Sequence, residues 1–248
     1  MTLSITVDVD GEAGLHDGGR GHADRLTSRS ERIYGITRGL PRILAALEGA
    51  GAPATFYVPG ATALRHPEAL AAITAEGHEI GHHGHHHLLS PGLSAAEQRA
   101  ELTDGLAALE STTGRRPRGY RSPGWELTPA TLDLLAALGF AYDSSLMGDD
   151  RPYAIASGDA AIVELPVHWS LDDAPHFAAT TDPAGLLAVW LAECRAAHAE
   201  RRHVTYTLHP DILGRPHRLD VLRRLLDLAA QLGVRAVTHA EAAASAAA

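Results

Sequence analysis

The 248-residue chain is 45% apolar and 21% charged, a composition typical of a globular protein and not of disordered, collagen-like or coiled-coil architectures. Its 21 basic and 30 acidic residues give a formal net charge of −9, and no basic run occurs, so we expect no nucleic acid and no membrane partner. This length suits one α/β domain over residues 1–248.

The sequence contains a single cysteine, Cys194, and no lysine. One cysteine cannot form an intrachain disulfide, and it excludes cysteine-based zinc and iron–sulfur sites. The missing lysine excludes Schiff-base and P-loop chemistry. Because the first residues also lack an export-type apolar segment, we expect a cytoplasmic protein.

Short β-branched runs alternate with longer helical patterns along the whole chain. The predicted strands cover residues 3–7, 54–58, 78–81, 118–121, 140–143, 162–167, 203–208 and 234–237. Helix ends are marked by Ser94 with Glu97, by Gly114, by Thr128 and by Asp182 with Pro183. The alternation predicts parallel strands covered by helices, and the strand count favours a closed barrel over an open sheet.

The first predicted strand ends in an acidic segment. Asp8 and Asp10 are two residues apart, so they point to the same side of the strand and can share one metal and water site. Glu12 continues this spacing of two residues. The Gly-rich residues 11–32 are predicted to form a long loop.

The third predicted strand leads into a run of six histidines, which are His78, His82, His83, His85, His86 and His87. Imidazole is the commonest metal ligand in proteins, so this density predicts a metal site. Three pairs have i, i+4 spacing. Gly77 is predicted to stop the preceding helix, and a strand followed by one turn would present His83 and His87.

An alternative interpretation comes from His78, Glu79 and His82, which match the H-E-x-x-H motif of zinc proteases. That motif requires a helix. Gly81 and Gly84 weaken any helix through this segment, so we favour the strand.

Three further polar groups follow later predicted strands. Arg121 is expected to pair with Asp8 or Asp10, and His209 ends an apolar strand. Asp172 and Asp173 form another strand-end pair that could shape a substrate pocket. In a closed barrel these groups would meet the early motifs at one end.

The sequence resembles the polysaccharide deacetylase (NodB-like, carbohydrate esterase 4) superfamily in eight segments between residues 6 and 218. These are TVDVDGE, YGITRGLPRIL, ATFYVPG, GHEIGHHGHHH, GYRSPGWELTP, YDSSLMGDDRPY, ELPVHWSLDD and TLHPDILGRPHR. More narrowly, it looks like the cytosolic branch, which contains cyclic imide hydrolases, allantoinase-like enzymes and peptidoglycan deacetylase-like proteins. That branch shares the Asp-Val-Asp spacing, whereas better-known polysaccharide-acting members have adjacent aspartates.

The resemblance implies an α/β fold, a distorted (β/α) barrel of about seven strands. By that resemblance Asp8 is the catalytic base, His209 the acid and Arg121 the residue that orients the base. Asp10, His83 and His87 would bind a divalent metal, with Zn²⁺ the first choice and Co²⁺, Ni²⁺, Mn²⁺ or Fe²⁺ as alternatives. Such an ion lowers the pKa of bound water toward about 7.

The resulting functional hypothesis is a metal-dependent hydrolase of non-peptide carbon–nitrogen bonds. Its expected partner is a small-molecule amide or N-acetyl substrate in the cytoplasm, and the resemblance implies a homotetramer. One alternative is a hydrolase that opens cyclic imide or ureide rings. Another is a metal- or ligand-binding protein without catalytic activity.

Overall fold

The computed structural model describes residues 1–19, 25–157 and 160–247. Its strands form a single curled sheet in which seven consecutive positions are parallel. Along the sheet these are β7 (Ala160–Glu164), β5 (Tyr142–Asp143), β4 (Gly119–Tyr120), β3 (Glu79–His82), β2 (Ala54–Val58), β1 (Thr2–Asp8) and β8 (Val204–Leu208). In addition, β6 (Tyr153–Ser157) pairs antiparallel with β7, and β9 (Arg235–Ala236) pairs with the start of β1.

One bridge joins the two ends of this parallel path. The chain that leaves β7 reaches Asp172, which pairs in parallel with Thr207 of β8. The sheet therefore curls into a distorted barrel of seven parallel strands, as predicted. The carboxyl ends of all seven strands open at the same end of this barrel.

Each of the eight predicted strands has a counterpart in the structure, and β6 is the strand that the prediction missed. Three of its five residues are alanine or serine, and none of the five is fully buried. Alanine and serine carry little strand signal, because a strand pattern rests on β-branched and aromatic side chains. The β6–β7 hairpin therefore could not be predicted from the pattern of β-branched and aromatic residues.

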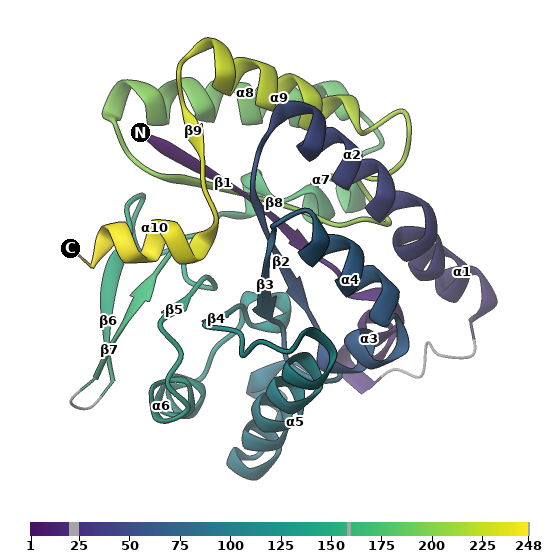
Figure 1. Cartoon of the computed structure of the whole chain (residues 1–248), viewed down its shortest axis with the longest axis vertical. Helices are drawn as coiled ribbons and strands as arrows, with labels where there is room; N and C mark the ends of the chain where they lie inside the picture. The colour runs from purple at the N-terminus through teal and green to yellow at the C-terminus, as the bar shows by residue number, and fades with distance from the viewer. Residues whose placement is uncertain (20–24, 158–159, 248) are drawn as a thin grey trace.

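Helices surround the strands on the outside (Figure 1). They are α1 (Leu26–Tyr34), α2 (Leu40–Ala50), α3 (Gly60–Arg65), α4 (Pro67–Ala75), α5 (Ala95–Thr113), α6 (Pro129–Ala137), α7 (Asp173–Ala179), α8 (Pro183–Glu200), α9 (Asp220–Gln231) and α10 (His239–Ala246). The predicted capping box of Ser94 and Glu97 starts α5, and Gly114 ends it with φ +68°. The Asp182 side chain caps α8 as predicted.

The predicted loop over residues 11–32 is wrong. A 3₁₀ helix covers Gly11–Gly19 and α1 starts at Leu26, while residues 20–24 lie outside the described part of the chain. Ala13 and Leu15 are buried, and the Glu12 carboxylate lies 2.7 Å from Nε2 of His66. Tertiary contacts therefore impose helical structure on a segment whose local sequence is Gly-rich.

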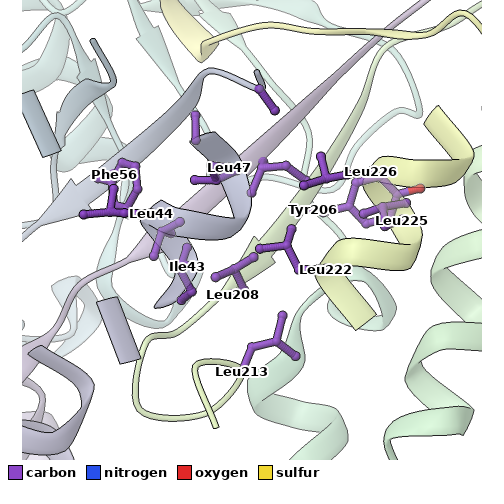
Figure 2. Close-up of a cluster of buried hydrophobic side chains, with 14 of the residues drawn as sticks. Ile43, Leu44, Leu47, Phe56, Tyr206, Leu208, Leu213, Leu222, Leu225 and Leu226 are labelled. Atoms are coloured by element: carbon purple, nitrogen blue, oxygen red, sulfur yellow. The ribbon is translucent and has the colours of Figure 1, made fainter. Parts of the chain in front are cut away.

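The side chains of β1 point alternately into the apolar core and toward the site inside the barrel. Its odd-numbered residues, Leu3, Ile5 and Val7, join the large apolar cluster between the sheet and its helices. Figure 2 shows this cluster, with Leu47 of α2 and Leu222 of α9 among the labelled side chains. The even-numbered Thr6 and Asp8 instead point into the barrel, where both contact Arg121.

The last helix, α10, closes the amino-terminal end of the barrel. Its first residue, His239, is fully buried and bonds the hydroxyls of Tyr57 (2.6 Å) and Thr205 (3.1 Å). Ala242 and Ala243 pack into an apolar cluster with Tyr57. In the described ranges, no helix has the length and apolar character needed to cross a bilayer.

Candidate metal-dependent active site

The predicted site residues all follow the carboxyl ends of strands. Asp8 ends β1 and Asp10 lies two residues beyond it, His83 and His87 follow β3, Arg121 follows β4 and His209 follows β8. Since these parallel strands share one open end, residues as distant in the sequence as Asp8 and His209 meet there. All six are buried or nearly so.

Asp10, His83 and His87 form one compact group. The Asp10 Oδ1 atom lies 3.6 Å from Nε2 of His83 and 3.5 Å from Nε2 of His87. One potential ligand atom from each residue lies within 4.8 Å of the others. His87 adopts a left-handed backbone conformation, φ 59°, which is costly for a residue other than glycine and is typical of functional positions.

The hydrogen bonding of this group matches what a metal requires. The Arg121 carbonyl can only accept, so the 2.8 Å contact fixes the proton of His83 on Nδ1 and leaves a lone pair on Nε2. Burial lowers the pKa of His83 to about 4, which keeps the ring neutral at pH 7. A backbone carbonyl behind a histidine ligand is the usual support in metal sites.

Asp10 supplies the matching anion. Burial alone would raise its pKa, but His87, His209, His83 and Arg32 outweigh burial and lower the pKa to about 2. Its Oδ1 atom is buried without a hydrogen-bond partner in the described residues. An orphaned carboxylate oxygen facing two imidazole nitrogens fits a divalent cation, for which this set leaves coordination positions open.

Arg121 holds Asp8 beside this group. Its Nη1 atom donates to Asp8 Oδ1 and to Thr6 Oγ1, both at 2.8 Å, so the predicted pairing of Arg121 with Asp8 is present. The guanidinium also donates to the carbonyl and the hydroxyl of Ser144 and lies 4.3 Å from the centre of the Tyr57 ring. Asp8 Oδ2 remains on the side of His83, 3.9 Å from Nε2.

His209 is held by Asp173. One carboxylate oxygen of Asp173 accepts from the backbone N–H of His209 at 3.0 Å, and the other lies 2.7 Å from Nδ1. Burial alone would lower the pKa of His209, but Asp173 and Asp172 outweigh it and raise the pKa well above its ordinary value. At neutral pH the ring is therefore protonated and able to donate a proton.

The remaining histidines of the run have structural contacts. His82 bonds the Leu102 carbonyl and the Gly84 amide, and burial lowers its pKa to about 3. Residues 79–82 form a strand, so the helix that a zinc protease needs is absent. Glu79 accepts hydrogen bonds from Thr55, Tyr142 and the amide of Ala240. The H-E-x-x-H interpretation is therefore wrong.

Sequence reasoning missed part of this site. Arg32 of α1 lies 3.5 Å from Asp10 and 3.1 Å from Asp211, and nothing in its local sequence indicated this. The sequence predicts the pair of Asp172 and Asp173 only as a group that shapes a substrate pocket. The chain after β7 bridges to β8 at Asp172, and this tertiary contact, which no local sequence pattern indicates, places Asp173 beside His209.

Two tryptophans stack at the edge of the site. The ring centres of Trp125 and Trp169 are 4.4 Å apart with an interplanar angle of 20°. Trp125 is buried and lies 5.8 Å from the Arg121 guanidinium, whereas Trp169 is 44% exposed. The pair gives the site an apolar, flat wall.

Comparisons with known proteins agree with the fold and indicate the family. The model of the polysaccharide deacetylase family matches residues 33–142. The chain is 28% identical to a peptidoglycan deacetylase of Helicobacter pylori over 98% of its own length and 95% of that protein. A crystal structure from Mycobacterium smegmatis, assigned to the polysaccharide deacetylases, has 40% identity and a TM-score of 0.92 over 98% of this chain and 89% of that one. The allantoinase PuuE is 23% identical with a TM-score of 0.89 over the same shares, which shows a common fold.

The barrel, its buried carboxylate–imidazole group and these similarities together define a metal-dependent hydrolase of the α/β-barrel type. The chain belongs to the polysaccharide deacetylase family.

Proposed function

We propose that this protein is a cytoplasmic metal-dependent hydrolase that removes the acetyl group from the N-acetyl amide of a small molecule. The observation that carries the proposal is the convergence of Asp10, His83 and His87 beside the Asp8–Arg121 pair. A divalent cation held by those three residues would supply Lewis acidity, which acidifies water and polarises a carbonyl oxygen.

Asp8 and His209 carry out the two proton transfers of the proposed reaction. Asp8, held in place by its ion pair with Arg121, takes a proton from the attacking water. His209, protonated beside Asp173, gives a proton to the nitrogen of the leaving amine. Asp8 ends β1 and His209 follows β8, the strand that pairs with β1, so both groups lie at the same open end of the barrel and can act on one amide.

Two observations support an N-acetyl substrate. The Helicobacter pylori relative, which is similar over almost its whole length, is a peptidoglycan deacetylase, so its substrate class is an N-acetylated amino sugar. The stacked Trp125 and Trp169 offer a flat apolar face of the kind that packs against sugar rings.

The proposed cytoplasmic location has separate support. The single buried Cys194, which has no disulfide partner, suits a reducing compartment.

The proposal is tested by metal analysis of the purified protein together with a hydrolysis panel. The panel contains N-acetyl amino sugars, acetylated amines, cyclic imides, hydantoins and allantoin. We expect one bound divalent ion per chain and turnover of N-acetyl compounds. Turnover of the cyclic compounds alone would replace this proposal with a ring-opening hydrolase, and metal binding without any turnover would indicate a binding protein.

Trp169→Ala should weaken substrate binding more than chemistry. Because the Trp169 ring stacks on Trp125 and takes no part in the proposed proton transfers, we expect KM to rise about 5- to 10-fold, the size of one lost aromatic contact, with kcat nearly unchanged. Steady-state kinetics on the best substrate of the panel measure both constants. Trp169→Phe is the matched control and should keep most of the binding; an equal loss in kcat would contradict a binding role.

Asp173→Asn should change the pH dependence of the reaction. Asp173, Asp172, Asp10 and Asp211 face His209, and the bond from Asp173 is the shortest contact to the ring. Removing its charge lowers the pKa of His209, so the proton donor is lost at lower pH and the alkaline limb of the kcat profile moves toward acid. The exposed Asp227→Asn variant should keep the wild-type profile, and an unmoved limb in Asp173→Asn would exclude His209 as the acid.

A further inference from the structure

A second cavity lies at the other end of the barrel from the proposed active site. It has a volume of about 640 Å³, within the range of small-molecule sites. Glu79, the first residue of β3, lines it, whereas His83 immediately follows the last residue of the same strand. The two sites are therefore separated by the length of β3, on the order of 13 Å.

Arginine dominates the charge of this cavity. Arg115, Arg116 and Arg118 all line it, within four residues of a lysine-free chain whose net charge is −9. Arg116 is partly engaged, since it donates to the Leu138 carbonyl and lies 3.9 Å from Glu110. The guanidinium groups of Arg115 and Arg118 make no hydrogen bond or ion pair with the described residues.

The carboxylate in the lining does not balance these three charges. Glu79 turns its oxygens inward, to the hydroxyls of Thr55 and Tyr142 and to the amide of Ala240 at the start of α10. Glu79 is thus already hydrogen-bonded and Glu110 lies beside Arg116, which leaves Arg115 and Arg118 without an ion-pair partner among the described residues. Planar guanidinium groups match phosphate and carboxylate oxygens in geometry as well as in charge.

The rest of the lining can contact the carbon skeleton of an organic ligand. Ile80 and Pro117 contribute apolar surface, and the Pro117 ring limits the backbone freedom between two of the arginines. His78 adds a further polar atom. Its Nδ1 accepts from the Ala54 amide, so the proton of the neutral ring lies on Nε2, which is 3.6 Å from Oε2 of Glu76, beyond hydrogen-bond distance, although the side chain is only 4% exposed.

We propose that this arginine-lined cavity binds a small organic polyanion, a metabolite with at least two phosphate or carboxylate groups, at a site separate from the hydrolase centre. The site would take this ligand through Arg115 and Arg118, with Arg116 and His78 in support. It makes no use of Asp10, His83 or His87, so binding there is independent of the proposed hydrolysis.

The test is titration calorimetry of the metal-loaded protein with pyrophosphate and, separately, with citrate. We expect saturable binding of at least one anion with one site per chain, weakened by added salt because the contacts are ionic. The Arg115→Gln/Arg118→Gln double variant should raise Kd at least about tenfold and leave hydrolysis unchanged. The anion that binds more tightly identifies the phosphate or the carboxylate class.

Two controls make the result specific. The Arg99→Gln/Arg223→Gln variant removes the same charge from exposed positions outside the cavity and should bind like the wild type. Asp10→Ala should also bind like the wild type, because these anions can ligate a catalytic metal and that route must be excluded. The proposal is overturned by no saturable binding of either anion, by equal weakening in the control pair, or by loss of binding in Asp10→Ala alone.

Discussion

Replacing Asp8 with asparagine is expected to lower kcat by about 10²- to 10⁴-fold while the protein keeps its metal. The range is that of a lost general base, because asparagine preserves the size of the side chain but cannot take a proton from water. Its oxygen can still accept from Arg121 Nη1, so the position of the guanidinium is retained. Hydrolysis rates and the metal content of the same preparations measure the two effects together.

Asp10→Ala is the comparison that separates base from ligand. Its carboxylate lies between the Nε2 atoms of His83 and His87, so alanine removes one of three proposed ligands and should remove the metal along with the activity. Loss of metal from Asp8→Asn, or retention of full metal by Asp10→Ala, would reverse the two assignments. Glu79→Gln should change neither the metal content nor the activity, because Glu79 lies at the end of β3 opposite to His83.

The part of the site that the sequence predicted rests on local geometry. Asp8 and Asp10 lie on one side of the chain because side chains alternate along a strand, and that rule needs no knowledge of the fold. The choice of His83 and His87 over two other spaced pairs followed from Gly81 and Gly84, which disfavour a helix through the segment. The barrel itself follows from the alternation of strands and helices, which is repeated along the whole chain.

What escaped prediction depends on contacts between distant segments. Asp173 reaches His209 only because the chain after β7 returns to β8, and no local pattern indicates that return. Arg32 contacts Asp10 from α1, a helix hidden in a segment predicted as a loop. The network that fixes Arg121 combines residues of four strand ends. A sequence pattern can place each residue at its strand end, but not its partners.

That network makes Arg121 the position where function and stability are most tightly joined. Arg121→Met should abolish hydrolysis and also destabilise the fold by about 3–5 kcal/mol, because the buried Asp8 charge and the Ser144 carbonyl lose their donor. Chemical denaturation of the metal-free proteins measures the free energy of unfolding, and the hydrolysis assay measures the loss of activity.

A double variant distinguishes the two contributions. In Asp8→Asn/Arg121→Met no buried carboxylate remains unpaired at this position, so the double variant should be more stable than Arg121→Met although it lacks more of the native contacts. It should stay inactive, since the base is gone. If the double variant is instead as unstable as the sum of both single changes, then Arg121 supports the barrel through Tyr57 and Ser144 and not through the charge of Asp8. The comparison therefore shows whether the barrel retains this buried cation to hold a catalytic carboxylate in place or to fill its own interior.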